Sequence, residues 1–407
     1  MKIKNCRSCS SQSFKKLYTL GNQYLTGIFP KNKSQNVSKG ELSMVMCNKC
    51  FLLQLENSFD VNTMYGENYG YLSSLNPHMI KHLKIKSEKL KKISKLSSSD
   101  IVMDIGSNDG TFLSNYKRTN RLIGVDPTIK KLKKFYRKDI IKIADFFSAD
   151  KVFHHIKTKK PKIITSISMF YDLPSPIKFA QDIYECLDDN GIWHLEQSYM
   201  PSMLKNISYD TICHEHLEYY SSNIIINLMK KNNLRVFDIK NNDINGGSSR
   251  YFICHKNGKF KINKNKITKI LRQEEKLKLE DKNSYFKYYK KINLIKNKTK
   301  KLIENLLSKG KVIHGYGAST KGNVFLQYLE ISSKKIPFIA ERNPLKFNKF
   351  TPGNYIKIIS EKKSRLKKPD YYLVLPWHFK KEILKREMKI RRQGTKFIFP
   401  LPNLKVI

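Results

Sequence analysis

Alternation of short apolar runs with helical stretches constrains the fold more than any other feature of this chain. The runs IVMDIG, LIGVD, IIKIAD, IITSIS and IWHLEQS, between residues 101 and 198, have the length and composition of buried strands. Helical stretches separate several of them, and strands joined in this way pair in parallel with helices on both faces. The sequence therefore predicts an α/β fold built on a doubly wound sheet.

A second pattern of the same kind begins near residue 312. It consists of VIHGYGAST, IPFIAER, YYLVLPW and FIFPLP, which predict a second Rossmann-like sheet. A Lys-rich helical stretch with Gly310 as its C-cap precedes this pattern, and another helix is expected from Met79 to Leu96. We predict three domains, with boundaries at residues 1–66, 67–255 and 256–407.

Composition limits the classes of function. The 407 residues are 40% hydrophobic and 28% charged, which is typical of a globular protein, and no apolar run is long enough to cross a bilayer. The net charge of +44 comes from lysines scattered through every segment, without the aromatic residues of an RNA-binding motif. We expect a cytoplasmic monomer that is not inserted in a membrane, has no nucleic-acid partner, and draws anionic substrates toward its surface.

Two CxxC pairs lie in the first 50 residues. Cys6 and Cys9 form one pair, and Cys47 and Cys50 form the other. Four thiolates satisfy a tetrahedral zinc ion, and the absence of a nearby His indicates a structural rather than a catalytic ion. Chance pairs or redox dithiols are the alternative, although redox chemistry needs only one pair. Two of the other three cysteines, Cys186, Cys213 and Cys254, are expected in the core.

The first strand of the long alternation ends in a glycine-rich loop. In IVMDIGSNDG the glycines let a ligand approach the backbone at the carboxyl end of the strand. An acidic residue that ends the next strand can accept the two hydroxyls of a ribose, and a polar and aromatic pair after the third strand suits an adenine. These spacings favour S-adenosylmethionine (SAM) over a dinucleotide. The expected cofactor-binding residues are Asp104, Gly106, Asn108, Gly110, Asp126, Asp145 and Phe146.

Titratable groups are concentrated in YDTICHEHLEYY, after the fifth strand. His214, Glu215 and His216 are the candidate catalytic residues, because His can take a proton near neutral pH and Glu can orient an imidazole or hold a hydroxyl. In an extended segment the two imidazoles would share a face, so that a contact with Glu215 would need a turn. Zinc ligation or a surface His-rich strand remains an alternative.

The second glycine-rich loop, GYGASTKGN, offers hydroxyls and a lysine to a diphosphate. It could also be a degenerate NAD site with Glu341 as the acid for the ribose. Arg250 follows a Gly-Gly-Ser turn and could contact a phosphate or a sugar, but the turn could equally be a plain hairpin. The expected substrate-binding residues are Arg250, Ser319, Thr320, Lys321 and Asn323.

Taken together, these motifs resemble those of the nucleotide-sugar C-methyltransferases. The shared strings include the two CxxC pairs, DIGSNDGTFL, YDTICHEHLEYYS, INGGSSRYFICHK, GYGASTKGNVFLQYL, ERNPLKFNKFTPG and PDYYLVLPWHF, which span essentially the whole chain. The resemblance implies a zinc module, a central SAM domain, and a C-terminal domain that encloses a nucleotide sugar against it. It assigns the base to His216 and the neighbouring carboxylate to Glu215.

Two positions depart from the pattern of this family. Cys213 stands where many members have Tyr, which removes one hydroxyl donor, and Asp172 stands where many have His. Tyr171 or one of Tyr65, Tyr69 and Tyr71 could replace the lost donor. The expected function is C-methylation of a nucleotide-linked keto-deoxysugar. The rivals are an NAD-dependent sugar-nucleotide oxidoreductase or epimerase, and an RNA-binding protein.

Overall fold

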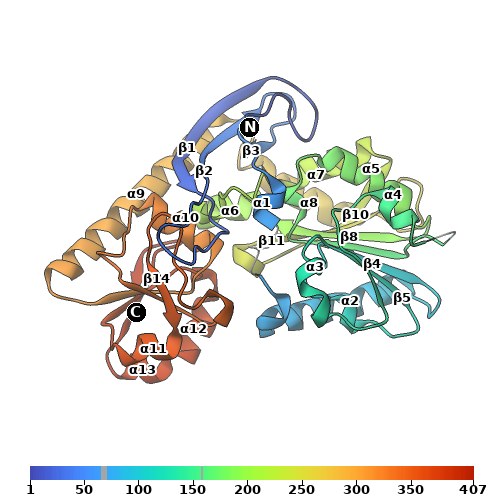
Figure 1. Cartoon of the computed structure of the whole chain (residues 1–407). Coiled ribbons are helices and arrows are strands. Elements are labelled where there is room, and N and C mark those ends of the chain that lie inside the picture. Colours follow the sequence, from blue (N-terminus) through green and yellow to red (C-terminus); the bar gives the residue numbers. More distant parts are fainter. Residues whose placement is uncertain (66–70, 157–158) are drawn as a thin grey trace.

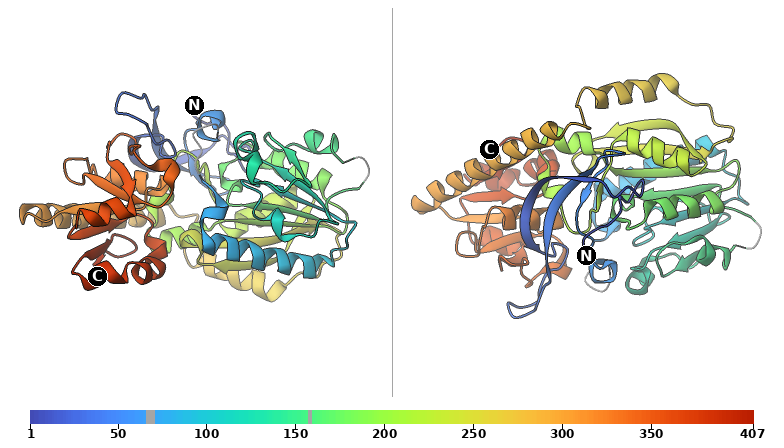
Figure 2. Two further views of the ribbon diagram at one scale, coloured as in Figure 1. Left: turned by 60° about the horizontal axis from the view of Figure 1, so that its bottom comes forward. Right: turned by 90° about the horizontal axis from the view of Figure 1, so that it is seen from above.

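The computed structural model of the chain describes residues 1–65, 71–156 and 159–407. Two α/β units lie beside each other, and a smaller antiparallel sheet from the N-terminal part lies along their junction (Figures 1 and 2). Among the described residues, none of the helices has the length and apolarity needed to cross a membrane.

The central unit contains a seven-stranded sheet in the order β10-β11-β8-β7-β4-β5-β6. The strands from β8 to β6 pair in parallel, whereas β11 pairs antiparallel with both β8 and β10. This arrangement confirms the predicted doubly wound sheet. Its strands are β4 (Ile101–Ile105), β5 (Arg121–Val125), β6 (Ile140–Ile143), β7 (Ile163–Ile167), β8 (Ile192–Ser198), β10 (Leu234–Asn242) and β11 (Ser248–His255).

Helices cover both faces of this sheet, because its strands are apolar on both sides. On one face, Met79, Leu83 and Leu90 of α2 pack in a cluster with Val102 of β4. The helix at Met79–Leu96 was thus predicted nearly correctly, since α2 spans Pro77–Ser94. The other helices of the unit are α3 (Ile129–Leu132), α4 (Ala149–Phe153), α5 (Pro176–Cys186), α6 (Met200–Asn206) and α7 (Ser222–Lys231).

The C-terminal unit is built on a six-stranded sheet in the order β14-β13-β12-β15-β16-β17. All of its pairs are parallel except β16 with β17. The second Rossmann-like sheet is therefore present, although β14 and β17 were not predicted. Its elements are β12 (Ile313–Tyr316), α10 (Thr320–Tyr328), β13 (Phe338–Glu341), β14 (Lys357–Ser360), α11 (Glu361–Leu366), β15 (Tyr371–Val374), α12 (Lys380–Arg386), α13 (Met388–Arg392), β16 (Lys396–Phe399) and β17 (Lys405–Val406).

Two helices connect the α/β units. Helix α8 (Lys264–Glu275) packs against α7 and β10 of the central unit, whereas α9 (Lys282–Ser308) contacts β1. Gly310, with φ +69°, follows the end of α9 as expected of a C-terminal glycine. The domain boundaries remain predictions; the packing shows that residues beyond 255 still belong to the core of the central unit, because Ile270 lies in its hydrophobic cluster.

The N-terminal part forms a four-stranded sheet in the order β1-β2-β3-β9. Its strands are β1 (Phe14–Tyr24), β2 (Lys39–Cys47), β3 (Leu53–Leu55) and β9 (Glu218–Tyr219), and the short α1 spans Val61–Tyr65. The fourth strand comes from the segment directly after the HEH motif. That segment is therefore held by the N-terminal module.

The four cysteines of the CxxC pairs meet at one point. Sγ of Cys6 lies 3.6 Å from Sγ of Cys50, Sγ of Cys9 lies 3.6 Å from Sγ of Cys47, and all four sulfurs lie within 4.8 Å of one another. Tetrahedral zinc with bonds of about 2.3 Å places its sulfurs about 3.8 Å apart. Gln54 Nε2 also donates to Cys6 Sγ at 3.2 Å, which suits a thiolate. The cluster fits a structural zinc ion.

We expect Cys9→Ser to lose the bound zinc and to lower the Tm by roughly 5–10 °C, because the free energy of metal binding contributes to folding. Zinc content by mass spectrometry and a thermal melt measure both effects. Lys49→Ala is the matched control, since this exposed side chain lies between the ligands without being one. A Cys9→Ser protein with unchanged zinc content and Tm would contradict the structural role.

Candidate active site

A cavity of about 1090 Å³ lies between the two α/β sheets. The loops after β4 and β12 both line it, and each of these strands stands where the order of its sheet reverses. Open α/β sheets bind ligands outside the carboxyl ends of their strands at such points. Two sites of this kind thus open into the same cavity. Gly27 and Phe29 of the N-terminal part also line it.

The glycine-rich loop after β4 is shaped by backbone angles that favour glycine. Gly106 has φ +71° and Gly110 has φ +74°. A Cβ atom at Gly106 would lie 2.9 Å from Cγ of Met169, so no larger residue fits there. Asp126, at the end of β5, accepts hydrogen bonds from the backbone N–H groups of Asn108 at 2.8 Å and Thr128 at 2.7 Å. Asp126 therefore fixes the loop while it lines the cavity.

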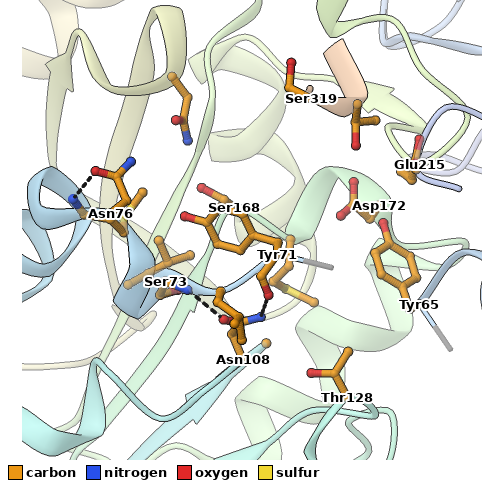
Figure 3. A pocket seen from close by; sticks show the side chains of 18 of the residues that line it. Tyr65, Tyr71, Ser73, Asn76, Asn108, Thr128, Ser168, Asp172, Glu215 and Ser319 are labelled. Carbon is orange, nitrogen blue, oxygen red and sulfur yellow. Dashed lines mark hydrogen bonds between the residues drawn. The ribbon is translucent and has the colours of Figure 1, made fainter. Parts of the chain in front are cut away.

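Asn108 ties a second segment over this loop. Its Oδ1 accepts from the backbone N–H of Ser73 at 3.0 Å, and its Nδ2 donates to the carbonyl of Tyr71 at 3.1 Å (Figure 3). Asp104 is buried beneath, and burial raises the pKa of its carboxyl to about 7. The side chain of Asn108 is thus engaged with the protein, although it also borders the cavity.

The far end of the cavity carries Asp145 and Phe146. Asp145 forms an ion pair with Lys151 at 2.8 Å, and the ring of Phe146 is 37% exposed. An aromatic face beside a carboxylate suits a nucleoside, and the acid at the end of β5 suits its ribose. The residues that line this half of the cavity therefore fit the adenosyl part of SAM.

The HEH motif forms a turn rather than a strand. The backbone N–H of His216 donates to the carbonyl of Cys213 at 3.1 Å, which directs Glu215 and His216 into the same cavity. Nδ1 of His216 lies 2.7 Å from the carbonyl oxygen of Thr211, so Nδ1 carries the proton and Nε2 keeps its lone pair. Burial and the charge of Lys321 lower the pKa of His216 to about 3, which leaves the imidazole neutral.

Two carboxyl groups line the same cavity as this imidazole. Burial raises the pKa of Glu215 and raises that of Asp172 well above its ordinary value, and the charge of Glu215 adds to the shift of Asp172. Glu215 accepts from the hydroxyl of Thr26 at 3.2 Å, and Tyr65 lies beside Asp172 (Figure 3). The ring of Tyr171 meets that of His216 edge on, with centroids 4.5 Å apart. Tyr69 lies outside the described residues.

His214 points away from the cavity, which corrects its place among the catalytic candidates. It is fully buried, its Nε2 lies 3.1 Å from the carbonyl of Gly40, and its ring packs on Phe59. The turn explains the difference, because it separates the two imidazoles that an extended segment would have placed on one face. Cys213 is also fully buried.

The C-terminal loop brings Ser319, Thr320 and Lys321 to the cavity. Asn323 does not line it and instead donates from Nδ2 to the carbonyl of Thr26 at 2.7 Å, which joins α10 to the N-terminal part. Glu341 accepts a hydrogen bond from the backbone N–H of Ala318 at 2.7 Å. Its carboxylate is therefore bonded to the second glycine-rich loop.

The structure also corrects the expectation that Arg250 binds the substrate. It lies on β11 opposite Glu196 of β8, away from the cavity lining. Glu196 there forms a buried ion pair with Lys86 and lies 3.0 Å from His82 Nε2. Arg250 therefore belongs to a charged cluster under α2, where burial lowers the pKa values of Lys86 and His82 and the charge of Arg250 adds to both shifts.

Sequence reasoning missed His378 and Asp210, both next to Lys321. His378 lines the cavity, and burial lowers its pKa to about 3. Asp210 is buried, and its Oδ2 accepts from Nε1 of Trp377 at 2.9 Å. The strings PWHF and YDT contain these residues, but only the tertiary structure brings them together.

Comparisons with known proteins agree with this geometry. Residues 6–65 match a family model described as a zinc binding domain, residues 78–239 match a methyltransferase domain, and residues 243–402 match a C-methyltransferase C-terminal domain. The C-methyltransferase NovU of Streptomyces niveus is 26% identical over 410 residues, which cover 100% of this chain and 97% of that relative. The chain is a SAM-dependent methyltransferase.

Solved structures similar to this methyltransferase include two plantazolicin methyltransferases in complex with SAH (S-adenosylhomocysteine). BamL is 14% identical with a TM-score of 0.35, and covers 44% of this chain and 85% of its own. BpumL is 12% identical with a TM-score of 0.36, and covers 44% of this chain and 86% of its own. The methyltransferase uses SAM, and its four-cysteine cluster is a zinc-binding site.

We expect Asp126→Ala to weaken SAH binding about tenfold or more, because the change removes both the acceptor for a ribose and the support of the glycine loop. Isothermal titration calorimetry with SAH gives the Kd. Asp139→Ala is the control, since this carboxylate pairs with Arg137 outside the cavity. Equal Kd values for the two variants would refute the role of Asp126.

The low pKa of His216 leads us to expect a weak dependence of activity on pH. Since the imidazole stays neutral well below its ordinary pKa of 6.5, kcat/KM should lose less than about half of its value between pH 7.5 and 5.5. The neutral form also favours the folded state, so the stability that it contributes is complete above pH 6.5 and decreases as the pH falls toward 3. Initial rates across this range test the assignment. A half-loss of kcat/KM centred near pH 6.5 would contradict it.

Proposed function

We propose that this enzyme methylates a carbon next to the ketone of a nucleotide-linked deoxysugar, with His216 as the base. The observation that carries the proposal is the geometry of His216. Its Nδ1–H is held by the carbonyl of Thr211, and its ring borders the cavity between the SAM loop and the C-terminal loop. A neutral imidazole with a fixed tautomer can take a proton through Nε2.

Carbon next to a ketone is acidic enough for such a base. His216 would take the proton while the electron pair of the C–H bond moves into the enolate. SAM supplies the methyl group as an electrophile on a sulfonium. Glu215 and Asp172, whose pKa values are raised by burial, can hold hydroxyl or amino groups of the sugar ring and so orient the carbon toward the donor.

The other half of the acceptor is a nucleoside diphosphate in this proposal. Ser319 caps α10, and its hydroxyl accepts from the backbone N–H of Gly322 at 3.0 Å, so that the N-terminus of this helix faces the cavity. Such a terminus favours a negatively charged group. The exposed side chain of Arg342 at the cavity adds positive charge, and the large net charge attracts an anionic substrate.

His216→Ala should lower methyl transfer at least about 10³-fold and leave SAH affinity unchanged, because the imidazole acts on the acceptor. Transfer of a radiolabelled methyl group to nucleotide 4-keto sugars gives the rate, and a label that resists mild hydrolysis shows a C–C bond. His154→Ala, an exposed imidazole outside the cavity, is the control. An active His216→Ala enzyme would exclude this base, and a wild type that labels no keto sugar would exclude the acceptor class.

A further inference from the structure

We infer that Lys321 is a catalytic residue that stabilises the enolate oxygen, rather than a ligand of the diphosphate. The inference rests on the proposed function and names the group that opposes the base. Lys321 lies in the second residue of α10, in a loop whose composition had suggested phosphate binding. The structure instead places its ammonium group at the junction of the two units, near His216.

The position of Lys321 is fixed by contacts with the central unit. Its Nζ donates to the carbonyl of Asn245 at 2.9 Å, in the turn between β10 and β11. Both Asn245 and Lys321 line the cavity, as do His216 and His378. Lys321 is therefore directed across the junction and borders the same cavity as His216, while Ser319 caps the start of α10.

The surroundings of Lys321 leave part of its amino group open to an acceptor. Burial lowers its pKa, and the nearby carboxylate of Asp210 opposes that shift. Asp210 is held in turn by Nε1 of Trp377 at 2.9 Å. Asn245 provides the one hydrogen bond of Nζ among the contacts of the described residues, so other N–H groups of the ammonium remain able to donate to an acceptor.

The reaction needs a positive charge at this place. When the C–H bond breaks, its proton passes to Nε2 of His216, its electron pair forms a C=C bond, and the π pair of the ketone moves onto the oxygen. The oxygen thus gains a negative charge within a buried cavity, where a fixed cation stabilises it far more than in water. The same cation opposes protonation of His216, and its net effect favours the reaction because the enolate oxygen accepts a direct hydrogen bond from Nζ.

The test measures proton exchange separately from methyl transfer. The SAH-loaded, zinc-containing enzyme is incubated with dTDP-4-keto-6-deoxyglucose in D₂O, and deuterium entry beside the ketone is followed by NMR. Lys321→Met should lower the maximal exchange rate at least about 100-fold, with KM changed less than about threefold. Lys321→Arg, which keeps the charge, should retain more activity than Lys321→Met. Lys335→Met, at an exposed lysine paired with Glu304, should match wild type.

Each alternative outcome is distinct. A KM raised about 100-fold with an unchanged maximal rate would assign Lys321 to the diphosphate and overturn the inference, as would unchanged exchange. Exchange that is absent in the wild type would remove the proposed function and this inference with it. If thermal melts show that Lys321→Met does not fold, Lys321→Gln carries the same test.

Discussion

The pairing of β3 with β9 is the constraint on which the candidate active site depends. Gln54 pairs with Glu218 across these strands, two residues beyond His216. Arg7, between the first two cysteines, donates to the carbonyl of Leu55 at 2.8 Å and lies 3.5 Å from Glu218. Because both partners of this ion pair are buried, losing either one would leave an uncompensated charge.

The pairing of β3 with β9 links the cysteine cluster to the turn that contains His216. The thiolates fix the ends of β2 and the start of β3, and β3 in turn fixes β9. The turn of His216 is then held between β9 and the carbonyl of Thr211, with the N–H of Leu217 bonded to the carbonyl of Tyr171 at 2.8 Å. The zinc-binding cysteines thereby help to determine where the imidazole of His216 lies.

Each of the two α/β units supplies a different part of the cavity lining. The central sheet supplies the glycine loop and Asp126, and the segment after it supplies His216, while the C-terminal sheet supplies Lys321 and His378. Side chains from both units therefore meet at one cavity. Hydrogen bonds from Lys321 to Asn245 and from Trp377 to Asp210 cross this junction and fix the two units relative to each other.

The sequence by itself determined the doubly wound sheets, the helix of residues 77–94, the four cysteines that converge and the glycine loop with Asp126. These features depend on local periodicity, on short ligand spacings and on backbone angles that only glycine adopts easily, all of which can be read within a few residues. Tertiary structure alone decided that His214 turns away while His216 faces the cavity, that Arg250 and Asn323 have structural partners, and that Lys321 lines the same cavity as His216. Those outcomes depend on a turn and on contacts between residues up to 297 positions apart, such as Asn323 with Thr26, and no local pattern encodes them.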